Sequence, residues 1–332
     1  MNTETQIVKE WLLKFPATPS LTLAKAIYKD NKKIFKSVED VRTIVRKLRG
    51  KLGKKGIKNP ICQIESKYNP FDSLPKGLKS YSDFTPISIQ GERILVLSDL
   101  HIPYHDLESL KLSLDFGVHN KVDTIILLGD VTDFYQASFW CKDPRARDLK
   151  SEIETTRKIL EIIRQAFPKS KIYYKIGNHE ERWERYLKVK APEFYTLFSE
   201  GDVLSYNSIF ETNKTKIEII QDKKILKIKS LNLLHGHELY QTLTNPVNPA
   251  RGLFLKGKEL SLCGHYHQTS NHTENTMSGK ILACWSIGCL CDLHPEYSPI
   301  NKWNHGFAYI ETKKDTFNVY NKKIVKGEIY NG

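Results

Sequence analysis

The chain has 332 residues and a formal net charge of +13, so it is long enough for one large domain and one small domain. The positive charge favours a polyanionic partner such as nucleic acid, although a solvated lysine-rich surface gives the same composition. No apolar run is long enough to span a membrane and the N-terminus lacks the order of a secretory signal, so we expect a cytoplasmic protein without a membrane partner.

The first 55 residues carry helical patterns. Apolar side chains recur at helical spacing over residues 4–15 and end before Pro16, which cannot continue a helix. A second helix is expected from Ser20. A third is expected from Ser37, whose hydroxyl can cap the amides of the first turn. These patterns predict a small helical domain.

The third helix is densely basic, with cations about one turn apart. These cations are Arg42, Arg46, Lys47 and Arg49. Residues 1–55 therefore resemble a helix-turn-helix domain, in which cationic side chains reach the phosphates and base edges of DNA. A docking bundle with a solvated basic face fits the same pattern, and both interpretations stay open. Residues 56–92 are punctuated by Pro, Gly, Ser and Asn, so we expect a linker and a lead-in strand.

Residues 93–330 contain apolar runs bounded by polar turns, which predict buried strands. The runs are RILVLSDL, TIILLGDV, KIYYKIGN, LNLLHGHE and LSLCGHYH. Helical patterns at residues 109–119 and 149–167 separate the first three runs and give β-α-β units. The expected architecture is an α/β sandwich of two packed sheets with outer helices.

Each of these strands is followed by residues that can bind metal, at the edge where α/β sheets present their sites. The fragments are Asp99 and His101, Gly129 and Asp130, residues 177–180 (GNHE), residues 235–237 (HGH) and residues 264–267 (GHYH). One such fragment alone is more often a helix cap or a satisfied polar group than a ligand. Five fragments in order make up a full ligand set, which chance rarely produces.

The ordered motifs D-x-H, GD, GNHE, H and GHxH resemble the calcineurin-like metallophosphoesterase superfamily over about residues 93–310. The resemblance implies a four-layer α/β/β/α sandwich and a dinuclear hydrolase in which metal-activated hydroxide attacks phosphorus. It further implies that Asp99, His101 and His267 bind one metal, that Asp130 bridges, and that Asn178, His235 and His265 bind the second metal. His179 would face the scissile phosphate without binding metal.

Carboxylate and imidazole ligands together suit Mn²⁺, Fe, Zn²⁺ or Ni²⁺ better than Mg²⁺, and we expect Mn²⁺ first. Asp133 and Glu180 are candidates for orienting His179 or a ligand imidazole, with helix capping as the alternative. Cys289 and Cys291 lack zinc-site spacing, so we interpret them as core residues.

The substrate depends on segments between the motifs. Arg145 and Arg147 are candidates for binding a second phosphate, although a surface loop explains their segment as well, and Arg182 can reach a substrate flank. Residues 301–307 combine polar and aromatic groups and are expected to close a pocket wall or a sheet edge.

The overall layout also resembles phosphoesterases of bacteriophages and their hosts, which implies the cytoplasm of a bacterial or phage-infected cell. We expect a phosphodiesterase or nuclease that acts on nucleic acid or nucleotides. The alternatives are a phosphomonoesterase of phosphoproteins or small metabolites, and a non-catalytic DNA-binding protein with a metal centre. The sequence does not define the oligomeric state.

Overall fold

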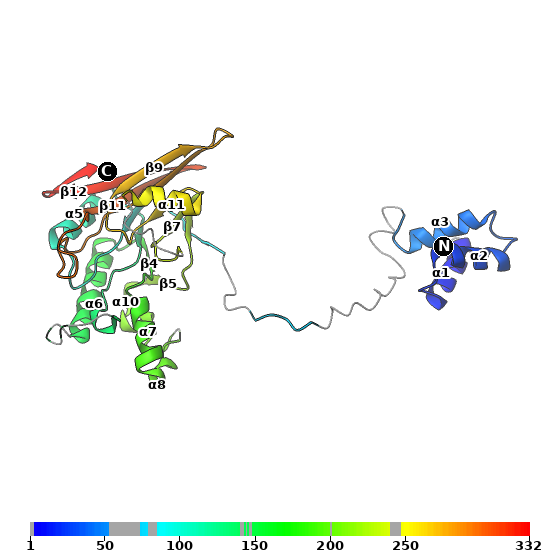
Figure 1. The fold of residues 1–332 in the computed structure, drawn as a ribbon, viewed down its shortest axis with the longest axis horizontal. Coiled ribbons are helices and arrows are strands. Elements are labelled where there is room, and N and C mark those ends of the chain that lie inside the picture. Colours follow the sequence, from blue (N-terminus) through cyan, green and yellow to red (C-terminus); the bar gives the residue numbers. More distant parts are fainter. Residues whose placement is uncertain are drawn as a thin grey trace. The chain divides into compact units, whose positions relative to one another are not determined.

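The structure is a computed structural model that divides the chain into two compact units, Met1–Ser80 and Tyr81–Gly332 (Figure 1). It describes residues 3–52, 74–78, 85–139, 143, 145, 148–199, 201–239 and 247–332. No helix among these residues is long and apolar enough to cross a membrane.

The N-terminal unit contains the three predicted helices. They are α1 (Thr3–Lys14), α2 (Ser20–Asp30) and α3 (Val38–Leu48). The hydroxyl of Ser37 accepts a hydrogen bond of 3.1 Å from the amide of Asp40, which confirms the predicted cap of α3. The helices enclose a small core of Val8, Leu12, Leu23, Ala24, Ile27, Phe35, Val41 and Val45.

Arg49 differs from the expectation that it reaches a DNA backbone. Its side chain is buried and donates hydrogen bonds to the carbonyl oxygens of Pro16 (2.9 Å) and Thr18 (2.5 Å) and to the hydroxyl of Ser20 (2.9 Å). A guanidinium satisfies several acceptors at once, so Arg49 joins the end of α3 to the turn between α1 and α2. The basic surface of α3 is therefore smaller than the sequence predicts.

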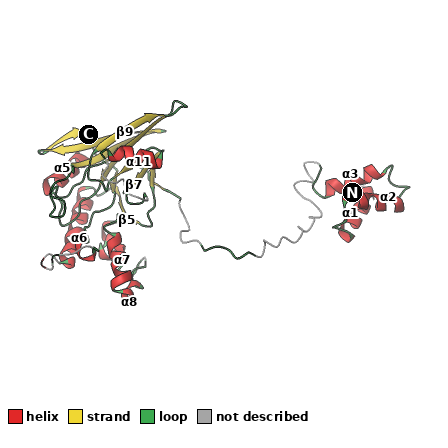
Figure 2. Ribbon diagram, viewed as in Figure 1, coloured by secondary structure: helices red, strands yellow, loops and turns green. Residues whose placement is uncertain are grey.

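The larger unit is built on two sheets (Figure 2). The six-stranded sheet has the order β1 (Ile87–Ser88), β6 (Leu226–Ile228), β7 (Leu231–Leu234), β8 (Ser261–Cys263), β10 (Ile281–Ser286), β9 (Ser270–Asn275). The seven-stranded sheet has the order β13 (Glu328–Asn331), β12 (Thr316–Val325), β11 (His305–Lys313), β2 (Arg93–Leu97), β3 (Thr124–Leu127), β4 (Lys171–Lys175), β5 (Ile217–Ile220). All five strands predicted from apolar runs are present.

Helices cover the outer faces of the sheets. The longer ones are α5 (Leu107–His119), α6 (Leu149–Ala166), α7 (Glu181–Lys190) and α11 (Pro249–Gly257). Short helices are η2 (Tyr135–Ala137), α8 (Pro192–Tyr195), α9 (Tyr206–Ile209) and α10 (Thr212–Thr215). The patterns at residues 109–119 and 149–167 therefore do form helices, α5 and α6.

Side-chain alternation along the strands separates two core layers. In β2, Leu95 and Leu97 pack into the core shared with α5 and α6, while Ile94 and Val96 pack between the two sheets. On the far side, α11 packs on β8, β9 and β10. The order helix, sheet, sheet, helix confirms the predicted sandwich.

The parallel strands bring their C-terminal ends to one edge. Leu95 of β2 pairs with Ile125 of β3, which in turn pairs with Ile172 of β4. In the other sheet β7 runs parallel to β8, with Leu234 opposite Cys263. The loops after these strands carry the motifs that the sequence singles out.

A buried ion pair joins the two sheets near this edge. Lys175, the last residue of β4, is fully buried, and its Nζ lies 2.7 Å from Oε1 of Glu238, which follows β7. Burial alone would raise the pKa of Glu238, but Lys175 and the neighbouring histidines lower this pKa to about 2. The carboxylate also accepts hydrogen bonds from the amides of His235 (3.1 Å) and Gly236 (2.7 Å).

We predict that Lys175→Met lowers the free energy of unfolding at pH 7 by about 3–5 kcal/mol, because it leaves a buried carboxylate without its cation. The double variant Lys175→Met/Glu238→Gln should recover most of this loss. Urea unfolding followed by circular dichroism measures both.

The pH dependence has a definite sign. A depressed pKa stabilises the fold above the ordinary value of 4.5, and this contribution is lost as the pH falls toward 2. The loss caused by Lys175→Met should therefore shrink between pH 5 and pH 3. An equal loss at both pH values would contradict the role of the ion pair.

Candidate metal centre

Loops after β2, β3, β4, β7 and β8 bring the predicted ligands together. The seven residues are Asp99, His101, Asp130, Asn178, His235, His265 and His267. The contacts among their side chains form a continuous series that begins at Asn178 and ends at His267.

At the His267 end of this cluster, one carboxylate and two imidazoles converge. Nε2 of His267 lies 3.2 Å from Oδ1 of Asp99 and 3.2 Å from Nε2 of His101. Oδ1 of Asp99 is buried and accepts no hydrogen bond from the described residues. Two ring nitrogens that face each other beside an unsatisfied carboxylate oxygen fit a divalent cation.

At the other end, Asn178 and His235 approach Asp130. Oδ2 of Asp130 lies 3.2 Å from Nε2 of His235, and the same ring nitrogen lies 3.1 Å from Oδ1 of Asn178. His265 completes a second group with Asp130 and His235, in which the possible ligand atoms all lie within 4.8 Å of one another. Oδ2 of Asp130 also lies 3.9 Å from Nε2 of His101, so Asp130 stands between the two ends.

Cys291 is buried, as expected of a core residue, and it also contacts the cluster. Its Sγ lies 4.0 Å from Nδ1 of His267. His101, His267 and Cys291 also form a group able to hold a metal. The C-x-C spacing gives no signal for this arrangement, because the loop after β10 brings the thiol to the ring.

Asp133 lies between two imidazoles. Its Oδ1 is 2.9 Å from Nδ1 of His179 and 3.0 Å from Nδ1 of His101, which fixes both rings. Arg182 closes the other side of His179, with Nη2 at 2.7 Å from Nε2 of the ring and Nη1 donating to the carbonyl oxygen of Asp133 at 2.9 Å. Of the two orienting residues that the sequence suggests, Asp133 makes such contacts.

Glu180 has a different task from both alternatives raised by the sequence. Its buried carboxylate accepts hydrogen bonds from the amides of residues 130–132 and Gly177 and from the hydroxyl of Tyr174, all between 2.8 and 3.0 Å. It makes no side-chain cap on α7. It therefore fixes the backbone of the loops that carry Asp130 and Asn178.

Two glycines of the motifs lie so close to cluster residues that a side chain would overlap them. A Cβ added to Gly264 would lie 2.7 Å from Oδ2 of Asp99, and one added to Gly129, where φ is +94°, would lie 2.5 Å from Nδ1 of His235. Both positions are closed to any side chain, because a Cβ there overlaps a cluster residue.

The backbone of the cluster adopts an unusual conformation. Five of its residues have left-handed φ angles: Asp99 (56°), His101 (48°), Asp130 (51°), His265 (68°) and His267 (54°). This region disfavours residues with a Cβ, by about 1 kcal/mol or more each. Surrounding hydrogen bonds, such as that from the amide of His265 to Oδ2 of Asp99 (2.9 Å), hold the conformation.

Opposite charges in the cluster shift the pKa values of its carboxylates and of two of its imidazoles. Burial alone raises the pKa of Asp99 and Asp130, but His267 beside Asp99, and His179 and His235 beside Asp130, lower both pKa values well below the usual range. Burial lowers the pKa of the histidines, yet Asp130 raises the pKa of His235 to about 10 and Asp99 raises that of His267 to about 9. Metal binding must therefore displace protons from these rings.

Cavities adjoin both ends of the cluster. One of about 280 Å³ is lined by Asn178, and one of about 600 Å³ is lined by Trp303, whose ring contacts that of His267. The first is lined by Ser138, Phe139, Asn178, Glu181, Arg182 and Arg185. Arg145 does not line the cavity at the Asn178 end.

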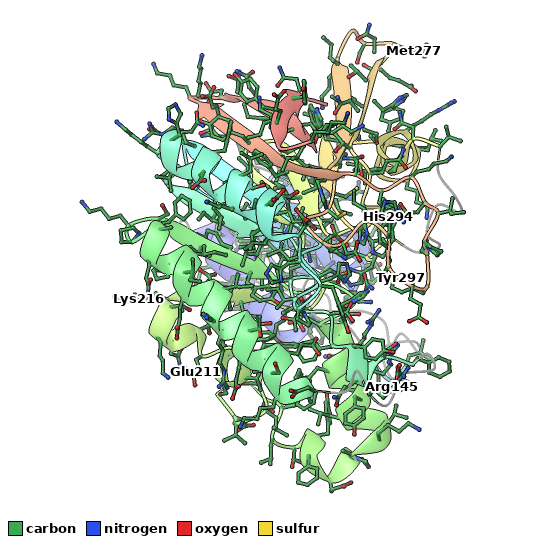
Figure 3. The ribbon with its side chains drawn as sticks, turned by 90° about the vertical axis from the view of Figure 1, so that its left-hand side faces the viewer. Arg145, Glu211, Lys216, Met277, His294 and Tyr297 are labelled. Atoms are coloured by element: carbon green, nitrogen blue, oxygen red, sulfur yellow. The ribbon has the colours of Figure 1, made fainter. Side chains whose placement is uncertain are left out.

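The side chain of Arg145 is exposed and pairs with Asp143 at 2.7 Å, so the structure does not bring Arg145 to the cluster (Figure 3). Arg147 lies outside the described residues.

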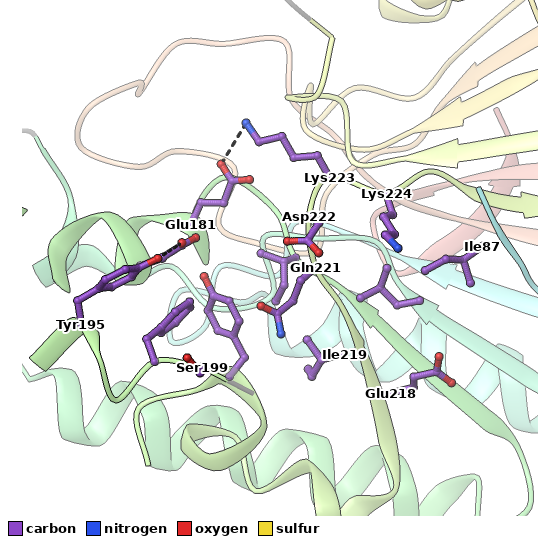
Figure 4. Close-up of a pocket in the computed structure, with 15 residues that line it drawn as sticks. Ile87, Glu181, Tyr195, Ser199, Glu218, Ile219, Gln221, Asp222, Lys223 and Lys224 are labelled. Carbon is purple, nitrogen blue, oxygen red and sulfur yellow. Dashed lines mark hydrogen bonds and ion pairs between the residues drawn. The ribbon is translucent and has the colours of Figure 1, made fainter. Parts of the chain in front are cut away.

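A larger cavity of about 730 Å³ lies beside the edge strand β5 (Figure 4). Glu181 lines it and pairs with Lys223 (3.5 Å) and with Nε2 of His237 (3.1 Å). His237 contacts these carboxylate neighbours and is not among the groups able to hold a metal in the described part of the chain.

Residues 92–282 match the family model described as calcineurin-like phosphoesterase. The chain belongs to this family. Histidine and aspartate groups within this match are placed so that they could hold metal ions.

Two relatives are phage proteins. The Gene 54 proteins of Mycobacterium phages L5 and D29 are each 29% identical to the chain over 124 residues, which are 35% of this chain and 48% of the relative. The chain thus spans about half the length of these curated relatives.

Solved structures with a similar arrangement include Vps29 of Cryptosporidium parvum (12% identity, TM-score 0.39, 73% of this chain and 96% of that chain). A Vps29 single mutant of Entamoeba histolytica has 14% identity and a TM-score of 0.38, over 72% of this chain and 96% of that chain. The phosphoesterase YfcE of E. coli has 13% identity and a TM-score of 0.31, over 65% of this chain and 87% of that chain.

We predict that Gly264→Ala loses most of its bound divalent metal, because the new methyl group overlaps the side chains of both Ser98 and Asp99. Metal content is measured by plasma mass spectrometry after loading with Mn²⁺ and desalting. Gly257→Ala is the matched control, since its Cβ would lie 3.7 Å from Oγ of Ser261, an ordinary van der Waals contact. Equal metal content in both variants would contradict the role of Gly264.

Proposed function

We propose that the chain is a dinuclear phosphodiesterase that acts on nucleic acid or nucleotides. The observation that carries the proposal is the position of Asp130, whose carboxylate is shared by two groups of donors next to His179. In this proposal Asp99, His101 and His267 hold one ion. Asn178, His235 and His265 hold the other, and Asp130 bridges them.

The donor set suits Mn²⁺ first, with Fe, Zn²⁺ and Ni²⁺ as alternatives, because it mixes imidazoles with carboxylates. Two such ions, when bound, supply Lewis acidity that neutralises phosphate charge and activates water for attack on phosphorus. Cys291 lies close enough to His267 to favour a softer ion at that end.

His179, Asp133 and Arg182 are the proposed catalytic and positioning groups. The carboxylate of Asp133 holds the proton on Nδ1 of His179, which leaves Nε2 directed toward Asp130 at 3.7 Å and toward Arg182. When a second proton on Nε2 makes the ring an imidazolium, Nε2–H can stabilise charge on a phosphate or pass that proton to the leaving oxygen, which leaves the neutral ring with its proton on Nδ1. Arg182 supplies a guanidinium that can bind a phosphate oxygen.

The cavities at both ends of the cluster favour a diester. A phosphodiester continues on both sides of phosphorus, whereas a monoester continues on one side only. The arginines at the Asn178 end and the net charge of +13 add attraction for a polyanion. The second candidate, a phosphomonoesterase, needs only one of the two cavities, and the third, a non-catalytic DNA-binding protein, needs no cavity for a reacting phosphate.

We further propose the domain assignment that the sequence predicts: a DNA-targeting helical domain at residues 1–55, a linker at 56–92 and a catalytic domain at 93–330. Arg46 and Lys47 of α3 remain as cations at its surface. The cytoplasm of a bacterial or phage-infected cell is the proposed location, supported by the phage relatives.

The Mn²⁺-loaded protein should hydrolyse bis-p-nitrophenyl phosphate in preference to p-nitrophenyl phosphate. His179→Ala should lower kcat by about 100-fold or more while it retains metal, because a proton donor is lost. Asp130→Asn should lose both activity and metal. A preference for the monoester would favour a phosphatase, and full metal occupancy in Asp130→Asn would contradict the bridging role.

Removal of residues 1–55 should leave hydrolysis of the chromogenic diester nearly unchanged. Affinity for duplex DNA should fall by about tenfold and become less dependent on salt, because phosphate contacts are lost. Fluorescence anisotropy at several salt concentrations measures the change. Unchanged affinity and salt dependence would show that the helical domain does not target DNA.

A further inference from the structure

A cavity beside the His267 end lies between the loop from β10 to β11, the start of α11 and the two residues that flank His267 in the chain. Its volume is about 600 Å³. It is lined by Pro249, Tyr266, Gln268, Ser298, Ile300, Asn301, Lys302 and Trp303, and we call it the Trp303 groove. The segment at residues 301–307, which the sequence expects at a pocket wall or a sheet edge, therefore forms a wall of this groove and then enters β11.

Internal hydrogen bonds fix this loop. The side-chain amide of Asn301 donates to the carbonyl oxygens of Leu293 (2.6 Å) and Ser298 (2.7 Å), and its oxygen accepts from the amide of Trp303 (2.8 Å). The amide of Asn304 then donates to the carbonyl oxygen of His267 (2.9 Å). Trp303 is therefore held in place beside a cluster residue.

The groove presents aromatic and apolar surface to solvent. The ring of Trp303 lies 4.1 Å from that of His267 and 6.2 Å from that of Tyr297, measured between centroids. Ile300, which lines the groove, is 95% exposed, and Tyr297, labelled in Figure 3, stands beside the groove and is 74% exposed. Exposed apolar side chains gathered around a fixed indole are suited to a flat, apolar ligand.

Charge restricts the kind of ligand. Lys302 is exposed, and in the described part of the chain no carboxylate pairs with it. Gln268 contributes a side-chain amide to the groove. Its Nε2 makes one long hydrogen bond, 3.4 Å, to the carbonyl oxygen of Val247. A cation, an amide and an aromatic platform together match a nucleotide, whose phosphate, base edge and base face need these three groups.

We propose that the Trp303 groove is a subsite for an unpaired nucleobase, adjacent to the phosphate that the cluster cleaves. Trp303 contacts His267, so a base stacked on the indole lies within one nucleotide of the cluster. A base inside a duplex has both faces stacked on neighbours and cannot enter without being flipped out. The subsite therefore selects single-stranded nucleic acid, which deepens the proposed phosphodiesterase function and rests on it.

The test compares a five-residue oligothymidylate with an oligonucleotide of equal length in which every site is abasic. The two ligands share phosphates and sugars, so their difference in affinity isolates the bases. Binding is measured by fluorescence anisotropy with the metal-loaded His179→Ala protein, to slow hydrolysis. We expect oligothymidylate to bind about 5- to 150-fold more tightly, the range for stacking of a base on an aromatic side chain.

Trp303→Ala in the same protein should remove most of this preference, whereas Trp303→Phe should keep most of it, since phenylalanine preserves a stacking face. Lys302→Met should weaken both ligands alike, because it removes charge and no stacking. Phe194→Ala, a change of a 51% exposed aromatic residue on α8, is the matched control and should change neither affinity.

Each outcome decides the proposal. Equal affinity for the two oligonucleotides before any change at Trp303, or a preference that survives Trp303→Ala, would overturn the nucleobase subsite. Either result leaves the phosphodiesterase proposal standing if bis-p-nitrophenyl phosphate is hydrolysed. Failure to hydrolyse that base-free diester would overturn the enzyme proposal instead, while a Trp303-dependent preference would still support the subsite.

Discussion

The geometry of the candidate metal centre depends on one buried carboxylate, which is not among the groups able to hold a metal in the described residues. Glu180 gathers backbone amides from the loops after β3 and β4, and those loops carry Asp130 and Asn178. A buried charge is tolerated only where donors compensate for lost water, and here five donors do so. Because both loops donate to the carboxylate of Glu180, neither loop can move without the other. This shared acceptor therefore sets the spacing between Asp130 and Asn178.

A second buried carboxylate, Glu238, plays the same role beside the six-stranded sheet. Glu238 accepts the amides of His235 and Gly236 and is neutralised by Lys175, which comes from the opposite sheet. One carboxylate thus organises the backbone of the seven-stranded sheet and another that of the six-stranded sheet. The ion pair between the sheets holds the two halves of the cluster at a fixed distance from each other. The geometry of the site therefore depends on how the two sheets pack.

The sequence predicts the strands, the sandwich and the convergence of the motif residues, because each of these follows from local patterns repeated at strand ends. It does not predict features created by contacts distant in the chain. Trp303 reaches His267 only through the loop before β11, and Cys291 reaches the same ring through the loop after β10. Arg49 has the pattern of a DNA-binding cation, yet the turn between α1 and α2 offers it three acceptors.

The left-handed residues of the cluster set a limit on how this protein can evolve. Glycine would relieve the backbone at His265 or His267, where φ is 68° and 54°, but it would delete a side chain of the centre. Selection for stability and selection for activity therefore act in opposite directions at these positions. On the proposed function, glycine or asparagine at either position would fit the left-handed backbone and keep the fold, while it would remove a proposed imidazole ligand.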